Sequence, residues 1–169
     1  MYILGIDPGL KGALCLAKDN VVQSLLPMPI KKVKDKTFID IVEVKNWVQG
    51  INSFYHIDKV LIEKQMVVSK QGLSSSGKTM YQFGLLEGLF EGMGLSPEVV
   101  TPKQWQKVIF PLVDTTVMNS YNYGDTKLKS IAFVEQRHGK DYLFTGKRQR
   151  KPSDGLADAI CIACAGFSL

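Results

Sequence analysis

Two short apolar runs, each ending in a carboxylate, constrain the fold of this chain more than any other feature. Residues 2–6 are apolar and stop at Asp7, and residues 60–62 are apolar and stop at Glu63. Short apolar runs bounded by polar residues are typical of buried strands. A carboxylate at the tip of a buried strand is costly unless a cation meets it. The pattern therefore predicts two strands that end at a cation site.

A second pair of acids comes near the end of the chain. Asp154 and Asp158 are four residues apart and precede an apolar segment at 159–165, so on a helix they share one face. Any one of the four acids, taken alone, has a simple explanation as an exposed surface charge. Four that converge form a site of hard oxygen ligands suited to Mg²⁺ or Mn²⁺.

Composition limits the class of protein. With 169 residues, of which 45% are hydrophobic, we expect a single domain over 1–169 whose core needs no disulfides. Cys161 and Cys164 fall inside the apolar segment and are predicted to be buried thiols. No apolar run approaches the roughly 20 residues that span a bilayer, and no signal segment precedes residue 2, so we expect a cytoplasmic protein with no membrane partner. The net charge of +5 favours a polyanionic partner.

The order of the predicted elements indicates the fold class. Strands at 2–7, 12–18 and 21–26 precede a lysine-rich loop and a helix at 38–54, and a strand at 59–63 delivers Glu63. A loop at 64–78, a helix at 79–93, a strand at 97–100 and a helix from Pro102 follow. An inserted loop at 111–124 leads to a helix, capped by Asp125 or Thr126, that runs to about 138. A basic loop at 147–151 precedes a final helix capped by Ser153 or Asp154. This order predicts an α/β protein of the ribonuclease H-like type, a mixed five-stranded sheet with helices on both faces.

Glycines recur at every fourth position of the predicted helix at 79–93, namely at Gly84, Gly88 and Gly92. Each glycine inside a helix costs about 0.5–1 kcal/mol relative to alanine. A row of them on one face therefore indicates close approach by another backbone, either a second subunit or a packed helix.

Six motifs, taken in order, resemble those of the RuvC-like Holliday junction resolvases, in particular the phage-type branch of this ribonuclease H-like family. They cover nearly the whole chain. The motifs are Ile-Leu-Gly-Ile-Asp-Pro-Gly at 3–9, Leu-Ile-Glu-Lys-Gln at 61–65, Lys-Gln-Gly at 70–72 with Phe83-Gly84, Val100-Thr101-Pro102 with Trp105, Asp125-Thr126-Lys127, and Asp-Gly-Leu-Ala-Asp-Ala at 154–159.

The resemblance implies a homodimeric, metal-dependent endodeoxyribonuclease that nicks two strands of a four-way junction or other branched DNA. Asp7, Glu63 and Asp158 match the catalytic acids of the family. The fourth family acid stands three residues before the last one, where this chain has Gly155, and Asp154 is on the same helical face. Lys127 matches a lysine near the scissile phosphate, and a second such lysine falls near Gln106 or Lys107.

Hydrolysis of a phosphodiester needs an activated water and a stabilised leaving oxygen, which two metal ions supply together. We expect two Mg²⁺ ions per site, with Mn²⁺ as a substitute. Asp7 would bridge them, Glu63 and Asp158 would hold one each, and Asp154 would add to the latter. We expect a set of basic residues to contact DNA phosphates. The alternative is that these residues are only solvent-exposed surface charges. They are Lys70, Lys103, Lys107, Lys127, Lys129, Lys147, Arg148 and Arg150.

Other functions fit parts of the sequence. Residues 72–79 match the phosphate-binding P-loop pattern letter for letter, and 108–114 is faintly similar to its metal-binding partner strand. A P-loop function would leave Asp7, Asp154 and Asp158 unexplained. A junction-binding protein without catalysis, and a related nuclease acting on RNA–DNA hybrids or branched replication intermediates, are further alternatives.

Overall fold

A five-stranded mixed sheet forms the centre of the computed structural model, which describes all residues except 67–72, 120, 122 and 147. The strand order is β3-β2-β1-β6-β7. β1 pairs antiparallel with β2 and parallel with β6, as predicted. The strands are β1 (Tyr2–Asp7), β2 (Ala13–Lys18), β3 (Val21–Pro27), β6 (Lys59–Glu63) and β7 (Glu98–Val100).

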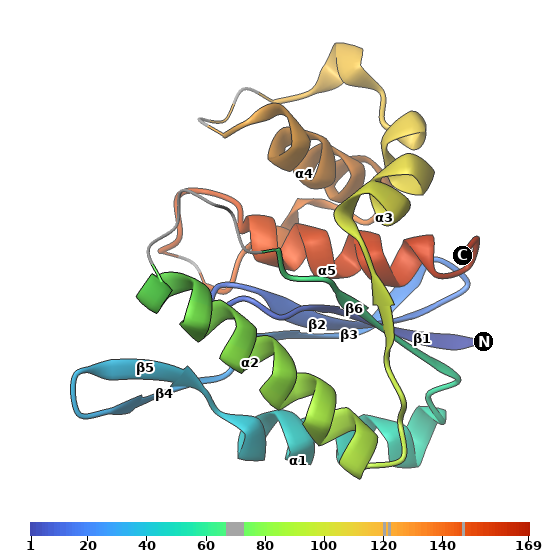
Figure 1. Cartoon of the computed structure of the whole chain (residues 1–169). Coiled ribbons are helices and arrows are strands. Elements are labelled where there is room, and N and C mark those ends of the chain that lie inside the picture. The colour runs from blue at the N-terminus through green and yellow to red at the C-terminus, as the bar shows by residue number, and fades with distance from the viewer. Residues whose placement is uncertain (67–72, 120, 122, 147) are drawn as a thin grey trace.

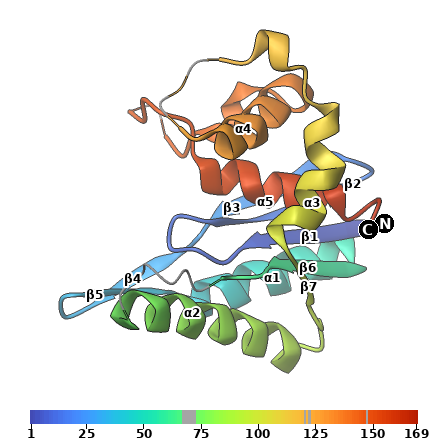
Figure 2. The same cartoon turned by 45° about the horizontal axis from the view of Figure 1, so that its top comes forward.

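Helices cover both faces of this sheet (Figures 1 and 2). α1 (Ile41–Tyr55) and α2 (Leu73–Gly92) pack on one face, where Leu4 and Ile6 point. α5 (Asp154–Ala165) lies on the other face, over Ile3, with α3 (Pro102–Ile109) beside it and α4 (Asp125–Arg137) stacked above it. Successive residues of a strand point to opposite faces, so odd-numbered residues of β1, Asp7 among them, face α5.

Glycine lets α5 approach the sheet at backbone distance. A Cβ added at Gly5 would stand 2.3 Å from the amide nitrogen of Ala163, and one at Gly155 would stand 2.0 Å from the carbonyl oxygen of Lys11. Neither position can hold a larger residue without moving backbone. The first turn of α5 is therefore fixed against the loop that follows Asp7.

The segment predicted as a lysine-rich loop is a β-hairpin instead. β4 (Ile30–Val33) pairs antiparallel with β5 (Lys36–Ile39) in a separate two-stranded sheet. Between the strands, Lys34 adopts a positive φ of 54°, as the favoured two-residue hairpin turns require. All four β4 residues are exposed, so the apolar-polar alternation that reveals a half-buried strand is missing.

Helix α2 begins at Leu73 rather than at 79, which removes the basis for a P-loop. The stretch predicted as a phosphate-binding loop is helical from Leu73 onward, and Gly72 lies outside the described residues. Its supposed partner strand is also absent, because Val108 and Ile109 end α3 and 110–112 form a 3-10 helix. Tertiary packing of the apolar residues farther along α2 outweighs the weak helix propensity of its Ser- and Gly-rich start.

Several helix ends differ slightly from the prediction. The Asp40 side chain caps α1, which therefore begins at Ile41 rather than 38. Gly124, and neither Asp125 nor Thr126, is the N-cap of α4. Ser153 caps α5, its hydroxyl accepting from the Leu156 amide at 3.3 Å. The 111–124 insertion includes a 3-10 turn at Thr115–Val117, and another occurs at Lys140–Leu143. In the described part of the chain, no helix combines the length and apolar character of a membrane span.

Candidate active site

Asp7 and Glu63 end neighbouring parallel strands in register. Ile6 is opposite Ile62, so the two acids that follow are opposite each other, and adjacent strands are about 4.8 Å apart. Both side chains point to the α5 side of the sheet. Ile3 shares a face of β1 with Asp7, Leu61 shares a face of β6 with Glu63, and both apolar residues belong to the core beneath α5. The sequence prediction that these two strand tips meet is confirmed.

Helix α5 brings Asp154 and Asp158 to the same end of the sheet. Gly155 packs against Lys11 and Gly12 in the loop after Asp7, which places the first turn of the helix over the tip of β1. The negative charge of Asp154 raises the pKa of Asp7. The negative charges of Asp7 and Glu63 raise the pKa of Asp158. The four predicted acids are thus electrostatic neighbours.

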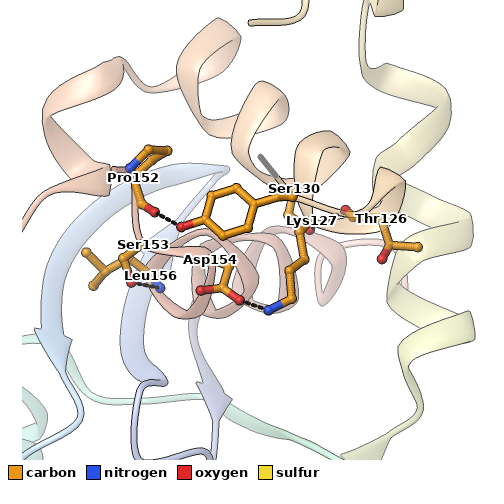
Figure 3. Close-up of polar contacts among 8 residues, drawn as sticks. Thr126, Lys127, Ser130, Pro152, Ser153, Asp154 and Leu156 are labelled. Carbon is orange, nitrogen blue, oxygen red and sulfur yellow. Dashed lines mark hydrogen bonds and ion pairs between the residues drawn. The ribbon is translucent and has the colours of Figure 1, made fainter. Parts of the chain in front are cut away.

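Lys127 reaches this cluster from α4. Its ammonium group pairs with the Asp154 carboxylate, and Figure 3 shows the side chain extending from α4 toward the start of α5. The hydrogen bond to Asp154 raises the pKa of Lys127. Lys127 also lies over the Tyr123 ring, 5.9 Å from its centroid, and the Tyr123 hydroxyl donates to the Pro152 carbonyl at 2.8 Å.

Three of the acids hold their protons more tightly than usual. Burial, followed by the charge of Asp7, raises the pKa of Asp158 to about 8 and that of Glu63 to about 7. Burial also raises the pKa of Asp7 to about 6, although the Gly9 amide donates to its carboxylate at 3.1 Å and opposes the rise. Desolvation and like charges disfavour the ionised form, so a cation at this place would relieve both.

Three of the four acids lack a salt-bridge partner in the described part of the chain, and the acids do not form a closed metal cage there. Among the described residues, no cation forms a salt bridge with Asp7, Glu63 or Asp158. Within the same residues, no three acidic, His or Cys side chains are arranged to hold one ion. Mg²⁺ commonly takes one or two carboxylates and completes its shell with water and substrate phosphate. Whether the four acids bind a metal ion therefore stays a prediction of the sequence.

Two buried residues support the acids and were not predicted as site residues. The indole nitrogen of Trp105, on α3, donates to a Glu63 oxygen at 2.8 Å. Ser130, on α4, lies against Asp158 and lowers its pKa, and its hydroxyl also approaches the Thr126 carbonyl at 3.2 Å. The burial of Ser130 is a structural observation, and a serine three residues after Lys127 is not informative in the sequence alone. The hydrogen bond between Trp105 and Glu63 joins residues 42 positions apart, so no local sequence pattern predicts it.

A groove of about 760 Å³ opens at Asp154, whereas Asp7, Glu63 and Asp158 do not line it. One wall contains Lys11 and Gly12 from the loop after β1, with Pro27 and Met28 from the end of β3. Residues 149–154 and the side chains of Tyr123 and Lys127 form the other wall. Its basic residues make the groove suitable for a phosphate backbone. These are Lys11, Lys127, Arg150 and Lys151.

The remaining predicted DNA contacts are distributed unevenly. Arg148 is exposed next to the groove, whereas Lys70 and Lys147 lie outside the described residues. Lys129 pairs with Asp125 at 2.8 Å. Lys103 and Lys107 are exposed on α3. Each is two positions from the inward-facing Trp105, which puts them on the opposite side of the helix.

The glycine row of α2 faces outward. Gly84, Gly88 and Gly92 are exposed, and no atom of the described residues lies within 4 Å of a Cβ built at any of them. A packed helix within the described chain is therefore not their neighbour. The second subunit stays a prediction.

Comparison with known proteins supports the fold that the motifs predicted. A scan of protein-family models and a search of curated protein sequences give no match. Among solved structures, Thermus thermophilus RuvC in complex with Holliday junction substrate has a TM-score of 0.59 and 16% identity, over 98% of this chain and 91% of that one. Fowlpox virus resolvase with substrate Holliday junction DNA has a TM-score of 0.51 and 16% identity, over 99% and 97%. The phage-type branch stays a prediction, and the chain has the ribonuclease H-like fold of the RuvC-like Holliday junction resolvases.

Proposed function

We propose that this protein is a metal-dependent endodeoxyribonuclease that resolves four-way and other branched DNA by paired nicks. The observation that carries the proposal is the in-register meeting of Asp7 and Glu63 beneath Asp158, all three with raised pKa values. The similarity to resolvases solved with Holliday junction DNA supports the choice of substrate.

The carboxylates would hold two Mg²⁺ ions, which supply an activated water and stabilise the leaving oxygen. Asp7 is central, because its charge acts on both Glu63 and Asp158. Glu63 and Asp158 would each help to hold the metal ions, and Asp154 would add to the site of Asp158. Mn²⁺, which also prefers oxygen ligands, is expected to replace Mg²⁺.

The other residues of the site position the substrate and the acids. Lys127 pairs with Asp154 and lines the groove with it, where its charge can offset that of a bound phosphate. Trp105 fixes the orientation of Glu63 through its hydrogen bond. The basic groove holds the strand through its phosphates, which predicts binding that weakens steeply as salt rises.

Paired nicks imply two active sites, and one chain provides one set of acids. A homodimer with two-fold symmetry matches the symmetry of two opposed strands at a junction. We propose that the exposed glycine row of α2, Gly84, Gly88 and Gly92, lies in this interface, since glycine permits two backbones to approach closely.

The direct test is cleavage of an immobile four-way junction and of a matched linear duplex, with Mg²⁺, Mn²⁺ or EDTA. We expect paired nicks in the junction alone, dependent on the metal. Asp7→Asn should reduce cleavage about a thousandfold or more and leave junction binding within a few-fold. Asp19→Asn is the matched control, because Asp19 is exposed at a turn with φ of 51°, a conformation that asparagine tolerates.

The outcomes separate the alternatives. Cleavage by Asp7→Asn at the wild-type rate would overturn the assignment of the site. Tight junction binding by the wild type without any nick would identify a junction-binding protein that lacks catalysis. Preferential cleavage of an RNA–DNA hybrid would retain the site and change the substrate.

A further inference from the structure

The β4–β5 hairpin is the most strongly basic projection of the described chain that the proposed site does not use. Lysine occupies four of the ten positions 30–39, and Asp35 is the single acid. Lys31, Lys32, Lys34 and Lys36 are all exposed. Figure 1 shows the hairpin extending beyond the body of the molecule, at the end where β1 stops and α5 begins.

The lysines lie on both faces of the hairpin as well as at its tip. Lys32 is opposite Thr37, and Lys31 is opposite Phe38, one position along. Because directly opposed residues share a face and successive residues alternate, Lys31 and Lys32 point in opposite directions, and Lys36 shares the face of Lys31. A ribbon that merely rested on a flat surface would need its charges on one face. Charges on both faces suit a ribbon that enters a groove with phosphates on each side.

The dimensions of the hairpin match such a groove. The two strands lie about 4.8 Å apart, so the ribbon is narrow, and its four-residue strands project roughly 13 Å at about 3.3 Å per residue. The major groove of B-form DNA is about 12 Å wide and accepts a two-stranded β-ribbon. Ile30 and Val33, each 51% exposed, give the ribbon apolar surface that can contact thymine methyl groups there.

The base of the hairpin is fixed relative to the acids. The Met28 amide donates to the Gly12 carbonyl at 2.9 Å, and the Asp40 amide donates to the Pro29 carbonyl at 2.9 Å. Ile39 is 1% exposed in the core under α1, and the Phe38 ring meets Tyr81 of α2 edge-on at 6.4 Å. Figures 1 and 2 both show the hairpin beside the first turns of α2.

The groove at Asp154 leads to the base of the hairpin. Pro27 and Met28, which line that groove together with Lys127, come immediately before Pro29 and β4. If a DNA strand lies in this groove, the duplex next to it extends toward the β4–β5 hairpin.

We infer that the β4–β5 hairpin inserts into the major groove of a duplex arm of the branched DNA and holds its phosphates with lysines on both faces. This inference rests on the proposed function and names the part of the substrate, the arm away from the cut, that the hairpin recognises. Its role is to set the angle at which the arm meets the active site.

The test compares two charge-matched double variants by binding to a four-way junction in EDTA, over a range of salt concentrations. Lys32→Gln/Lys36→Gln alters the hairpin and spares Lys31, which pairs with Asp40 at 3.5 Å. Lys18→Gln/Lys140→Gln removes two exposed lysines outside the hairpin and outside the groove lining. Lys18 is opposite Tyr2, at the end of β1 away from Asp7. Thermal unfolding of each variant checks that its fold is intact.

We expect the hairpin variant to bind the junction about tenfold more weakly at about 0.1 M salt, and the slope of log K against log salt to fall by about 2. The control should stay within about twofold of wild type. Hydroxyl-radical footprinting should show wild-type protection along one arm that the hairpin variant loses.

Equal binding and equal footprints for the hairpin variant would overturn the hairpin inference while leaving the proposed function intact. If the wild type neither binds nor cuts branched DNA, the proposed function falls and the inference falls with it. A loss of affinity equal in both double variants would also overturn the inference, because it would show a general effect of charge.

Discussion

Helices α5 and α2 each carry small residues at every fourth position, but the two rows meet different surroundings. On α5 the row is pressed against backbone, and a Cβ at its first member would stand 2.0 Å from a carbonyl oxygen. On α2 no described atom lies within 4 Å of such a Cβ. The same spacing thus serves packing within the chain in one helix and leaves an open surface in the other. The rows are Gly155, Ala159 and Ala163 on α5, and Gly84, Gly88 and Gly92 on α2.

The largest effect is expected from adding one methyl group to the α5 row. Gly155→Ala would force its Cβ against the Lys11 carbonyl, so backbone must move. We expect the free energy of unfolding to fall by about 3 kcal/mol and cleavage to be lost as the helix lifts from the loop after Asp7. Urea unfolding measures the first effect and junction cleavage the second. A variant as stable and active as wild type would show that α5 is not held at backbone distance.

A smaller effect is expected from the acids that the close packing of α5 buries. The pKa values of Asp7, Glu63 and Asp158, about 6, 7 and 8, lie above the ordinary values near 4. A raised carboxyl pKa in the folded state contributes stability that is complete below the unfolded pKa and is lost as pH rises through the folded one. Without metal, the protein should therefore lose stability between about pH 5 and pH 8.5.

Asp158→Asn should reduce that loss, and Mg²⁺ should stabilise the wild type more at pH 8 than at pH 6, because ionised carboxylates bind it better. The midpoint of thermal unfolding with EDTA and with Mg²⁺, measured across this pH range, checks both statements. The α2 row lies apart from these acids, so Gly88→Ala should follow the wild-type pH profile. A flat profile for the wild type would contradict the assignment of the raised pKa values.

The smallest effect is expected on α2. Gly88→Ala should raise the stability of the monomer by about 0.5–1 kcal/mol, because alanine favours the helix and the site has room. Gly88→Leu should dissociate the dimer if the α2 row is the interface. Urea unfolding at dilute concentration and light scattering across a concentration series measure the two effects. A dimer that survives Gly88→Leu would place the interface elsewhere.

The sequence predicted the sheet, and the meeting of the two strand ends at Asp7 and Glu63, for a physical reason. Asp7 and Glu63 end strongly apolar runs, and a charge in that position is informative by itself. The order of strands and helices then determined which tips are neighbours. Asp154 and Asp158 could be assigned to one helical face from their spacing alone.

Other features depended on contacts that no local pattern encodes. The hairpin was predicted as a loop because exposed lysines on both of its faces, with Pro27 and Pro29 before them, hide the strand signal. The start of α2 at Leu73 depends on packing farther along the helix. Trp105 belongs to one of the sequence motifs, but its hydrogen bond to Glu63 joins residues that are far apart in the chain.

The contact between Trp105 and Glu63 gives the protein an internal optical reporter. Indole emission responds to charge and hydrogen bonding at the ring nitrogen, which here touches one of the acids of the proposed cation site. The other tryptophan, Trp47, lies on α1 beneath the opposite face of the sheet. Occupancy of the site can therefore be followed as a change in the fluorescence of a single residue, without a label and without DNA.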